Sequence, residues 1–200
     1  MVDLRYDCDW RRIMSNLTVT VSDIKKDLEK KQSQFAKAIN ATTSDFGRRG
    51  QGWVSQEVRK VYNTDLKTIK STYKGYKKEG KIRVGGVQID NVKLLYQGRT
   101  LTLSHFGMTP KARPSKPYQV KAAVLKGAKK VVASDAFVGS PKGVTLAFRR
   151  EGSERLPIKA LRALSVPQMV TSDRTEPSIS KRISEELEKR WEHNVERFNK

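Results

Sequence analysis

Short runs in which apolar and polar residues alternate fill the middle of the chain. They cover residues 118–125, 131–139 and 144–150, and they are rich in β-branched and aromatic side chains. Glycine, proline and lysine lie between them, at residues 126–130 and 140–143. Alternation interrupted by turn-forming residues is typical of an antiparallel meander. The pattern therefore predicts a central antiparallel β-sheet with basic turns.

Before this sheet, apolar residues recur at helical spacing. The spacings are four, seven and four positions, and the residues are Ile24, Leu28, Phe35 and Ile39. Such a stripe gives a helix one apolar face. We expect this helix to begin at an N-cap, Ser22, and to end near residue 43. The glycine-rich stretch 47–52 then predicts a loop or a hinge.

Two more helices are expected before the sheet. They cover residues 53–62 and 64–80, and the second carries Tyr73 and Tyr76 on its apolar side, with lysines facing solvent. Both are short and amphipathic, so each should pack against a neighbouring element. The sequence thus predicts a helical N-terminal region.

The connections around the sheet are less regular. Residues 81–84 and 100–108 have a strand pattern, and residues 91–96 fit either a strand or a short helix. The stretch 109–117 holds three prolines and three basic residues, which predicts an exposed loop. Residues 165–169 predict a short turn or helix.

The end of the chain predicts one long amphipathic helix. It should open around Pro177 and Ser178, and its opposite side carries alternating charges. The residues of its apolar side are Ile179, Ile183, Leu187, Trp191, Val195 and Phe198. We expect this side to be buried on the central sheet.

These patterns predict an α+β fold that forms one compact domain. Residues 1–16 show no clear period and are expected to be an N-terminal arm, and residues 17–80 form the helical region. Residues 81–170 form the basic β-sheet core, and residues 171–200 the C-terminal helix. A chain of 200 residues is long enough to bury one such core.

The charge is unevenly distributed. The net charge is +20, and residues 81–150 hold 14 basic and two acidic residues, a net +12. Such a field attracts polyanions, usually nucleic acid, but also acidic protein surfaces. The basic residues on predicted loops and turns, which we expect to face DNA or a partner, are Lys111, Arg113, Lys116, Lys126, Lys129, Lys130 and Lys142. Arg149, Arg150 and Arg155 are candidates for ion pairs at a subunit interface.

Residues that could carry catalysis or hold a metal are few and scattered. Cys8, His105 and His193 lie far apart, and none has a second ligand at metal spacing. Asp90 and Asp135 are the only acids of the basic middle and do not form a carboxylate pair. We therefore expect no catalytic, metal or cofactor site.

Membrane insertion and export are not expected either. No apolar run approaches the roughly 20 residues that span a bilayer. The first 14 residues contain three aspartates and no apolar segment of the secretory kind. A single cysteine, Cys8, fits assembly in a reducing cytoplasm.

Several sequence strings precede the charged C-terminal helix, in the order FAKAINATTSDFGRR, VYNTDLKTIK, LSHFGMTPKARP, AFVG and GVTLAFRREGSERLPIKALRALSVPQMV. These strings in this order resemble the minor tail protein Z family of tailed phages and prophages. The likeness runs from about residue 21 to residue 199. Its most specific parts are residues 148–167 and Ala38-Ile39-Asn40.

This resemblance implies a tail completion protein, a structural component of the virion and not an enzyme. Such proteins lie in the neck, at the head-proximal end of the tail, next to the tail terminator and the tail tube. They assemble in the host cytoplasm, as rings matched to the sixfold tail, and help to join tail to head for DNA ejection. A homo-oligomeric, hexameric ring is therefore expected.

Two other functions remain open from the residues alone. A free protein that binds nucleic acid without sequence preference would also carry a strongly basic surface. A nuclease would need an acidic metal cluster, which the basic middle does not supply, so this function ranks last.

Overall fold

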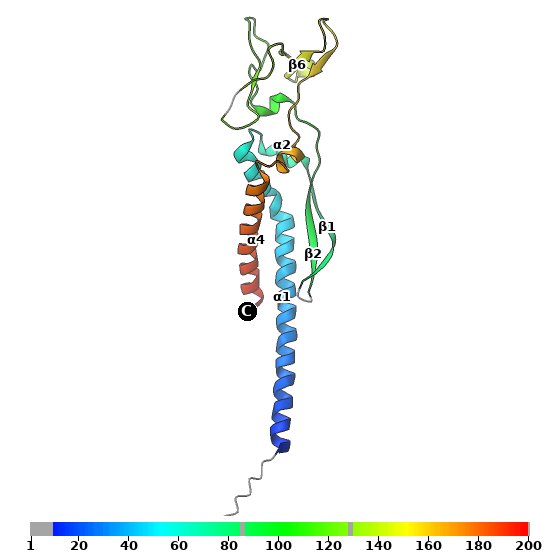
Figure 1. Cartoon of the computed structure of the whole chain (residues 1–200), viewed down its shortest axis with the longest axis vertical. Helices are drawn as coiled ribbons and strands as arrows, with labels where there is room; N and C mark the ends of the chain where they lie inside the picture. Colours follow the sequence, from blue (N-terminus) through cyan, green and yellow to red (C-terminus); the bar gives the residue numbers. More distant parts are fainter. Residues whose placement is uncertain (1–9, 85–86, 128–129, 200) are drawn as a thin grey trace, which may run out of the picture.

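The computed structural model describes residues 10–84, 87–127 and 130–199, and it has an elongated α+β fold (Figure 1). The predicted fold class is thus confirmed. The α-helices are α1 (Trp10–Val61), α2 (Leu66–Thr72), α3 (Val166–Val170) and α4 (Glu176–Asn199). The central element is α1, with 52 residues.

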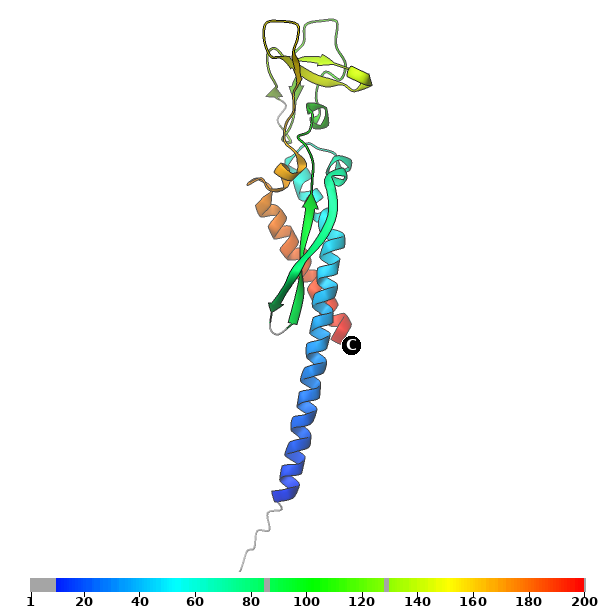
Figure 2. The same ribbon diagram turned by 90° about the vertical axis from the view of Figure 1, so that its right-hand side faces the viewer.

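The lower part of the molecule, called the body here, consists of α1, α4 and a β-hairpin. The hairpin pairs β1 (Tyr73–Val84) with β2 (Val87–Tyr96) in antiparallel fashion. Strand β2 packs against α1, and β1 lies further out. Helix α4 runs along the other side of α1, so α1 lies between α4 and the hairpin (Figures 1 and 2).

Residues 100–164 form an upper lobe of short elements (Figure 1). They are η1 (Leu103–Phe106), β3 (Lys121–Ala122), β4 (Lys130–Val131), β5 (Phe137–Gly139), η2 (Pro141–Gly143), β6 (Leu146–Arg150) and β7 (Ile158–Ala160). Strands β3 and β4 form one pair, and β5, β6 and β7 form a three-stranded antiparallel meander.

Two clusters of buried side chains hold the fold together. One lies where α1, α2, α3 and α4 meet, and includes Val58, Ile69 and Met169. The other fills the upper lobe around Val120 and Val138. Val124 and Ala163 pack against both clusters, so the upper lobe and the body share apolar contacts.

The predicted break at residues 47–52 is wrong, because α1 continues through it. Glycine here allows close packing and does not end the helix. A Cβ atom on Gly47 would lie 2.9 Å from the Tyr76 ring, and one on Gly50 would lie 3.0 Å from Leu94. Ser22, the predicted N-cap, lies inside the helix as well. Of the predicted arm, residues 10–16 belong to α1 and the rest lies outside the described residues.

The predicted helix 64–80 is also wrong in its second half. Helix α2 ends at Thr72, and Tyr73 begins β1, where its ring packs on Tyr96 with centroids 5.4 Å apart. Gly75 and Gly80 have φ angles of 99° and 68°, which glycine adopts without strain, and they lie at the two register shifts of the hairpin. A bulged strand does not show simple alternation, so the lysine-rich pattern of this strand resembles that of a helix.

The single central sheet is replaced by smaller sheets. Of residues 118–125, only Lys121 and Ala122 belong to a strand, β3, and Leu125 forms an isolated bridge with Tyr62. Strand β7, which the sequence does not predict, completes the meander of β5 and β6. Within residues 100–108, Leu103–Phe106 form the 3-10 helix η1 in place of the predicted strand, and Thr102 makes an isolated bridge to Arg162. Because these strands are short, much of the upper lobe consists of the loops that connect them.

The C-terminal helix packs against α1, and its predicted position on the sheet is wrong. Buried Ile179 joins the main apolar cluster, and Asn194 Nδ2 donates to Thr42 Oγ1 at 3.1 Å. The reason is the long apolar stripe of α1, which offers α4 a matching helical face. The short strands of the upper lobe offer no comparable face.

Several local predictions are confirmed. Helix α3 follows Ser165, whose backbone N–H and side chain form a capping box with Gln168. Residues 91–96 are part of β2, residues 109–117 form an irregular segment, and the last helix starts at Glu176. Among the described residues, no helix is both long and apolar enough to cross a membrane.

Candidate functional site

The predicted basic residues lie in the upper lobe. Lys111, Arg113 and Lys116 are exposed on the segment 109–117, and Lys126 and Lys130 are exposed on the connection between β3 and β4. Lys129 and the side chain of Lys142 lie outside what the structure describes. The upper lobe thus carries five exposed cationic side chains from the predicted set.

Lys111 also lines a polar hollow of about 660 Å³ between the body and the upper lobe. Asp65, His105 and the η2 residue Gly143 contribute to the same walls. His105 Nδ1 lies 3.4 Å from Thr68 Oγ1. Within residues 10–84, 87–127 and 130–199, no three His, Cys, Asp or Glu side chains come close enough to hold a metal ion together.

The three candidate interface arginines have different surroundings. Arg149 Nε donates to Asp135 Oδ2 at 2.7 Å, and this hydrogen bond lowers the pKa of the Asp135 carboxyl below its ordinary value of 3.8. The Arg150 guanidinium lies 5.8 Å from the centre of the Phe137 ring. Arg155 is exposed in the connection between β6 and β7. Two of the three are therefore engaged within the meander itself.

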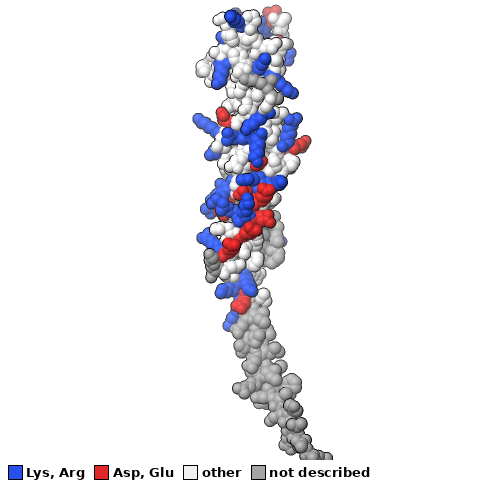
Figure 3. Space-filling view, turned by 90° about the vertical axis from the view of Figure 1, so that its left-hand side faces the viewer, with Lys and Arg blue, Asp and Glu red and all other residues white. Residues whose placement is uncertain are grey.

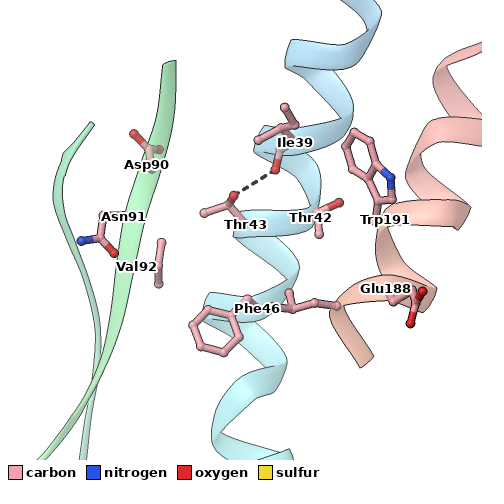
Figure 4. A pocket seen from close by; sticks show the side chains of 10 residues that line it. Ile39, Thr42, Thr43, Phe46, Asp90, Asn91, Val92, Glu188 and Trp191 are labelled. Atoms are coloured by element: carbon pink, nitrogen blue, oxygen red, sulfur yellow. Dashed lines mark hydrogen bonds between the residues drawn. The ribbon is translucent and has the colours of Figure 1, made fainter. Parts of the chain in front are cut away.

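An apolar groove of about 490 Å³ lies in the body, between α1, β2 and α4. Figure 4 shows its lining from three elements, with Phe46 on α1, Val92 on β2 and Trp191 on α4. Asp90 and Glu188 stand on its two sides, where α1 separates the hairpin from α4. The sequence did not reveal this groove, because its walls come from segments about 150 residues apart.

The apolar stripe predicted for α1 continues out of this groove. Ile39 lines the groove, and the Phe35 ring lies 5.8 Å from that of Trp191. Further along, Leu28 is 61% exposed and Phe35 is 47% exposed. The side chain of Ile24 lies outside the described set.

The N-terminal part of α1 projects beyond the rest of the molecule. Helix α4 and the hairpin run alongside only its C-terminal part (Figures 1 and 2). All described side chains from Lys26 to Ser33 are exposed. This projecting segment is defined here as residues 10–33, and those of its side chains that the structure describes, residues 26–33, are not covered by another element of the chain.

The two outer elements of the body differ in charge. Helix α4 presents exposed glutamates to one side, together with exposed Lys181, Lys189 and Arg197, and Figure 3 shows acidic side chains with basic ones among them at the level of this helix. Strand β1 carries exposed lysines on the other side. Cross-strand pairs Lys78–Asp90 and Lys93–Glu79 hold the hairpin, and these hydrogen bonds raise the pKa of Lys78 and lower that of Glu79.

Comparison with known proteins gives no match, whether to a family model, to a curated protein or to a solved structure. Three features distinguish the surface of the described residues: the basic upper lobe, the apolar groove with the projecting segment, and the two charged sides of the body.

Proposed function

We propose that the protein is a structural component of a phage virion, a tail completion protein in the neck. In this function it assembles as a ring at the head-proximal end of the tail, helps to join the tail to the head and lets DNA pass. The observation that carries the proposal is the uncovered apolar stripe of α1, which leaves the groove and continues onto the projecting segment.

A helix without a packing partner gains little stability from its backbone hydrogen bonds alone. Helices of globular proteins are held mainly by burying an apolar face. Leu28, with 61% of its surface exposed, lies on the projecting segment where its own chain offers no such cover. A partner that buries this face would stabilise α1, as expected of a protein that acts by docking.

The length of α1 suits a part that reaches into a neighbouring protein. Its 52 residues correspond to about 78 Å at 1.5 Å per residue. The body and the upper lobe stay at one end, and the projecting segment extends away from them (Figure 1). This arrangement separates a docking element from the rest of the fold.

The resemblance to the minor tail protein Z family supplies the particular partners. They are the tail terminator or tail tube on one side and neck proteins on the other. The proposed mechanism is docking and completion, in which no covalent bond is made or broken, so that neither a catalytic residue nor a cofactor is required. The protein then works in the virion, after assembly in the host cytoplasm.

The test uses purified tails that lack this protein. Labelled protein should bind one end of each tail in a fixed number, and such tails should then join to heads. The Leu28→Glu variant should bind at least about tenfold more weakly, because the new charge would be buried at the contact. Leu156→Glu is the matched control, because Leu156 is similarly exposed, at 67%, but lies in the upper lobe.

Binding along the whole tail, or none at all, would overturn the proposal. Equal binding by the Leu28→Glu variant would remove the projecting segment from the docking surface.

A second function is favoured by one observation, the five exposed cationic side chains of the upper lobe. A protein that binds nucleic acid without sequence preference would lose affinity steeply as salt rises, because bound cations are released from the phosphates. Gel-shift titrations of duplex DNA at increasing salt test this. A protein that coats DNA and ignores tails would replace the first proposal with this one.

A further inference from the structure

Exposed glutamates outnumber basic side chains on α4, whereas β1 exposes only basic charges on the opposite side of the body, so one chain presents both. We propose that copies of this protein associate head to tail, with the acidic side of α4 in one copy against the lysine-bearing strand β1 of the next. This inference rests on the proposed ring and names its subunit interface. The partner is therefore a second copy of this chain.

The acidic side belongs to the C-terminal half of α4. Its exposed glutamates follow each other at spacings of three, four and four residues, which places them on one helical face. The glutamates are Glu185, Glu188, Glu192 and Glu196. Exposed Lys181 and Lys189 lie on the same face by helical spacing, so this face carries four acidic and two basic side chains, a net −2. The ion pairs found within α4 instead use Glu186, which lies 3.1 Å from Arg182 and 3.7 Å from Lys189.

The basic side belongs to β1. Lys74, Lys77, Lys81 and Arg83 are exposed along the strand. The ion pairs found in the hairpin use Lys78 and Lys93 and none of these four residues. Strand β1 is also the outer strand of a two-stranded sheet, with α1 packed mainly against β2. Lys81 pairs with Asp90, which lines the groove, so these exposed basic side chains lie along the outer edge of the hairpin and not on one face of it.

Both sides lie at the same level along α1. The groove is lined by Asp90 and Val92 from β2 and by Leu187 and Trp191 from α4, so these segments flank the same turns of α1 (Figure 4). Lys81 pairs with Asp90 in the strand register, and Lys78 pairs with Val92. Lys77 and Lys81 are consequently level with Glu188 and Glu192.

Helix α1 separates the two charged sides, so one copy cannot bring them together (Figures 1 and 2). Opposite charges on different sides favour a heterologous contact, in which each copy uses one side toward each neighbour. In a twofold contact, α4 of one copy would meet α4 of the other, or β1 would meet β1, so that like charges would lie opposite each other. Because the sides are level, neighbouring copies need no shift along α1, which favours a closed ring over a helical filament.

Charge-reversal variants test the contribution of each side to self-association separately. One variant carries Glu188→Lys and Glu192→Lys, and the other carries Lys77→Glu and Lys81→Glu. Each alone places like charges across the contact, so its self-association should weaken by more than about tenfold. Mixed in equal amounts, the two variants should assemble again, because the basic α4 of one meets the acidic β1 of the other. Light scattering at low salt measures the mass in each case.

The mixture also shows that each variant is folded, because only folded partners would assemble. A chain with all four changes should assemble alone. A matched control with Lys111→Glu and Lys116→Glu should assemble like the unchanged protein, since both lysines are exposed in the upper lobe.

Assembly of either double variant like the unchanged protein would overturn the inference, and so would a mixture that stays monomeric. An unchanged protein that remains monomeric at all concentrations would overturn it too. The proposed function is tested separately by binding to tail ends, and a monomer that joins tails would retain that function without this interface.

Discussion

Two glycines of α1, Gly47 and Gly52, differ in the space around them. A Cβ atom on Gly47 would press on the Tyr76 ring at 2.9 Å, whereas one on Gly52 would meet nothing within 4 Å. Alanine is better than glycine in a helix interior by roughly 0.5–1 kcal/mol. Gly52→Ala should therefore raise the free energy of unfolding by about that amount.

Gly47→Ala should not show this gain. The added methyl group would displace the Tyr76 ring from α1, so we expect a loss of about 1 kcal/mol, typical of an overpacked contact. Urea unfolding of both variants gives the comparison. Equal stabilisation by the two changes would mean that the hairpin does not pack closely on Gly47.

Asp135 gives a prediction for pH. The hydrogen bond from Arg149 lowers the pKa of the folded carboxyl below 3.8, so folding favours the ionised form. The resulting stabilisation is present above the ordinary pKa and is lost as the pH falls through the lowered value. Titration of the Asp135 carboxyl by NMR should give a midpoint below 3.8, and Arg149→Gln should move it upward. A midpoint that Arg149→Gln leaves unchanged would exclude this ion pair.

At the scale of elements, Asn194 fixes α4 on α1. Its side chain is 2% exposed and donates to Thr42 Oγ1, while the Thr42 hydroxyl donates to the backbone carbonyl of Ala38. Asn194→Ala removes a buried hydrogen bond and leaves a small cavity, which should cost about 1–3 kcal/mol.

The loss should be local. Hydrogen exchange should show faster exchange in the C-terminal half of α4 and unchanged protection around Val120 and Val138 in the upper lobe. Glu196→Ala is the control, because Glu196 lies on the exposed side of the same helix. Uniformly faster exchange throughout the chain would show that α4 and the upper lobe unfold together.

The elements that could be predicted from sequence are those specified by local patterns. The stripe from Ile179 to Phe198 predicts α4, and residues 165–169, predicted as a short turn or helix, contain most of α3. The glycine-rich stretch 47–52 wrongly predicts a loop, because the role of its glycines depends on a hairpin distant in sequence. Gly47 and Gly50 allow Tyr76 and Leu94 to pack closely on α1. A glycine that ends a helix cannot be distinguished in sequence from one that lets a neighbouring side chain pack closely on the helix.

At the scale of the whole molecule, the basic upper lobe could be predicted, because its residues lie close together in the sequence. The groove could not, since Phe46, Val92 and Trp191 meet only when two separate elements pack on α1. The same holds for the opposite charges of α4 and β1. Those charges were visible in the sequence, but their positions depended on β1 being a strand and on α4 packing against α1.

The projecting segment gives the last prediction, which concerns the division between folding and docking. The buried residues of both apolar clusters begin at Val54, so a chain shortened by residues 1–30 keeps every member of the core. We expect its melting temperature to stay within a few degrees of the full chain, because little apolar surface is lost from the body. Scanning calorimetry measures this directly.

The same shortened chain should lose its binding to tail ends, because Leu28 and the rest of the uncovered helix are gone. Its head-to-tail association should persist, since Glu188, Glu192, Lys77 and Lys81 remain in place. A shortened chain that unfolds would show that the projecting segment stabilises the body. One that still binds tails would place the docking surface outside residues 1–30. Retained association with lost tail binding would establish that α1 docks while α4 and β1 join the copies to one another.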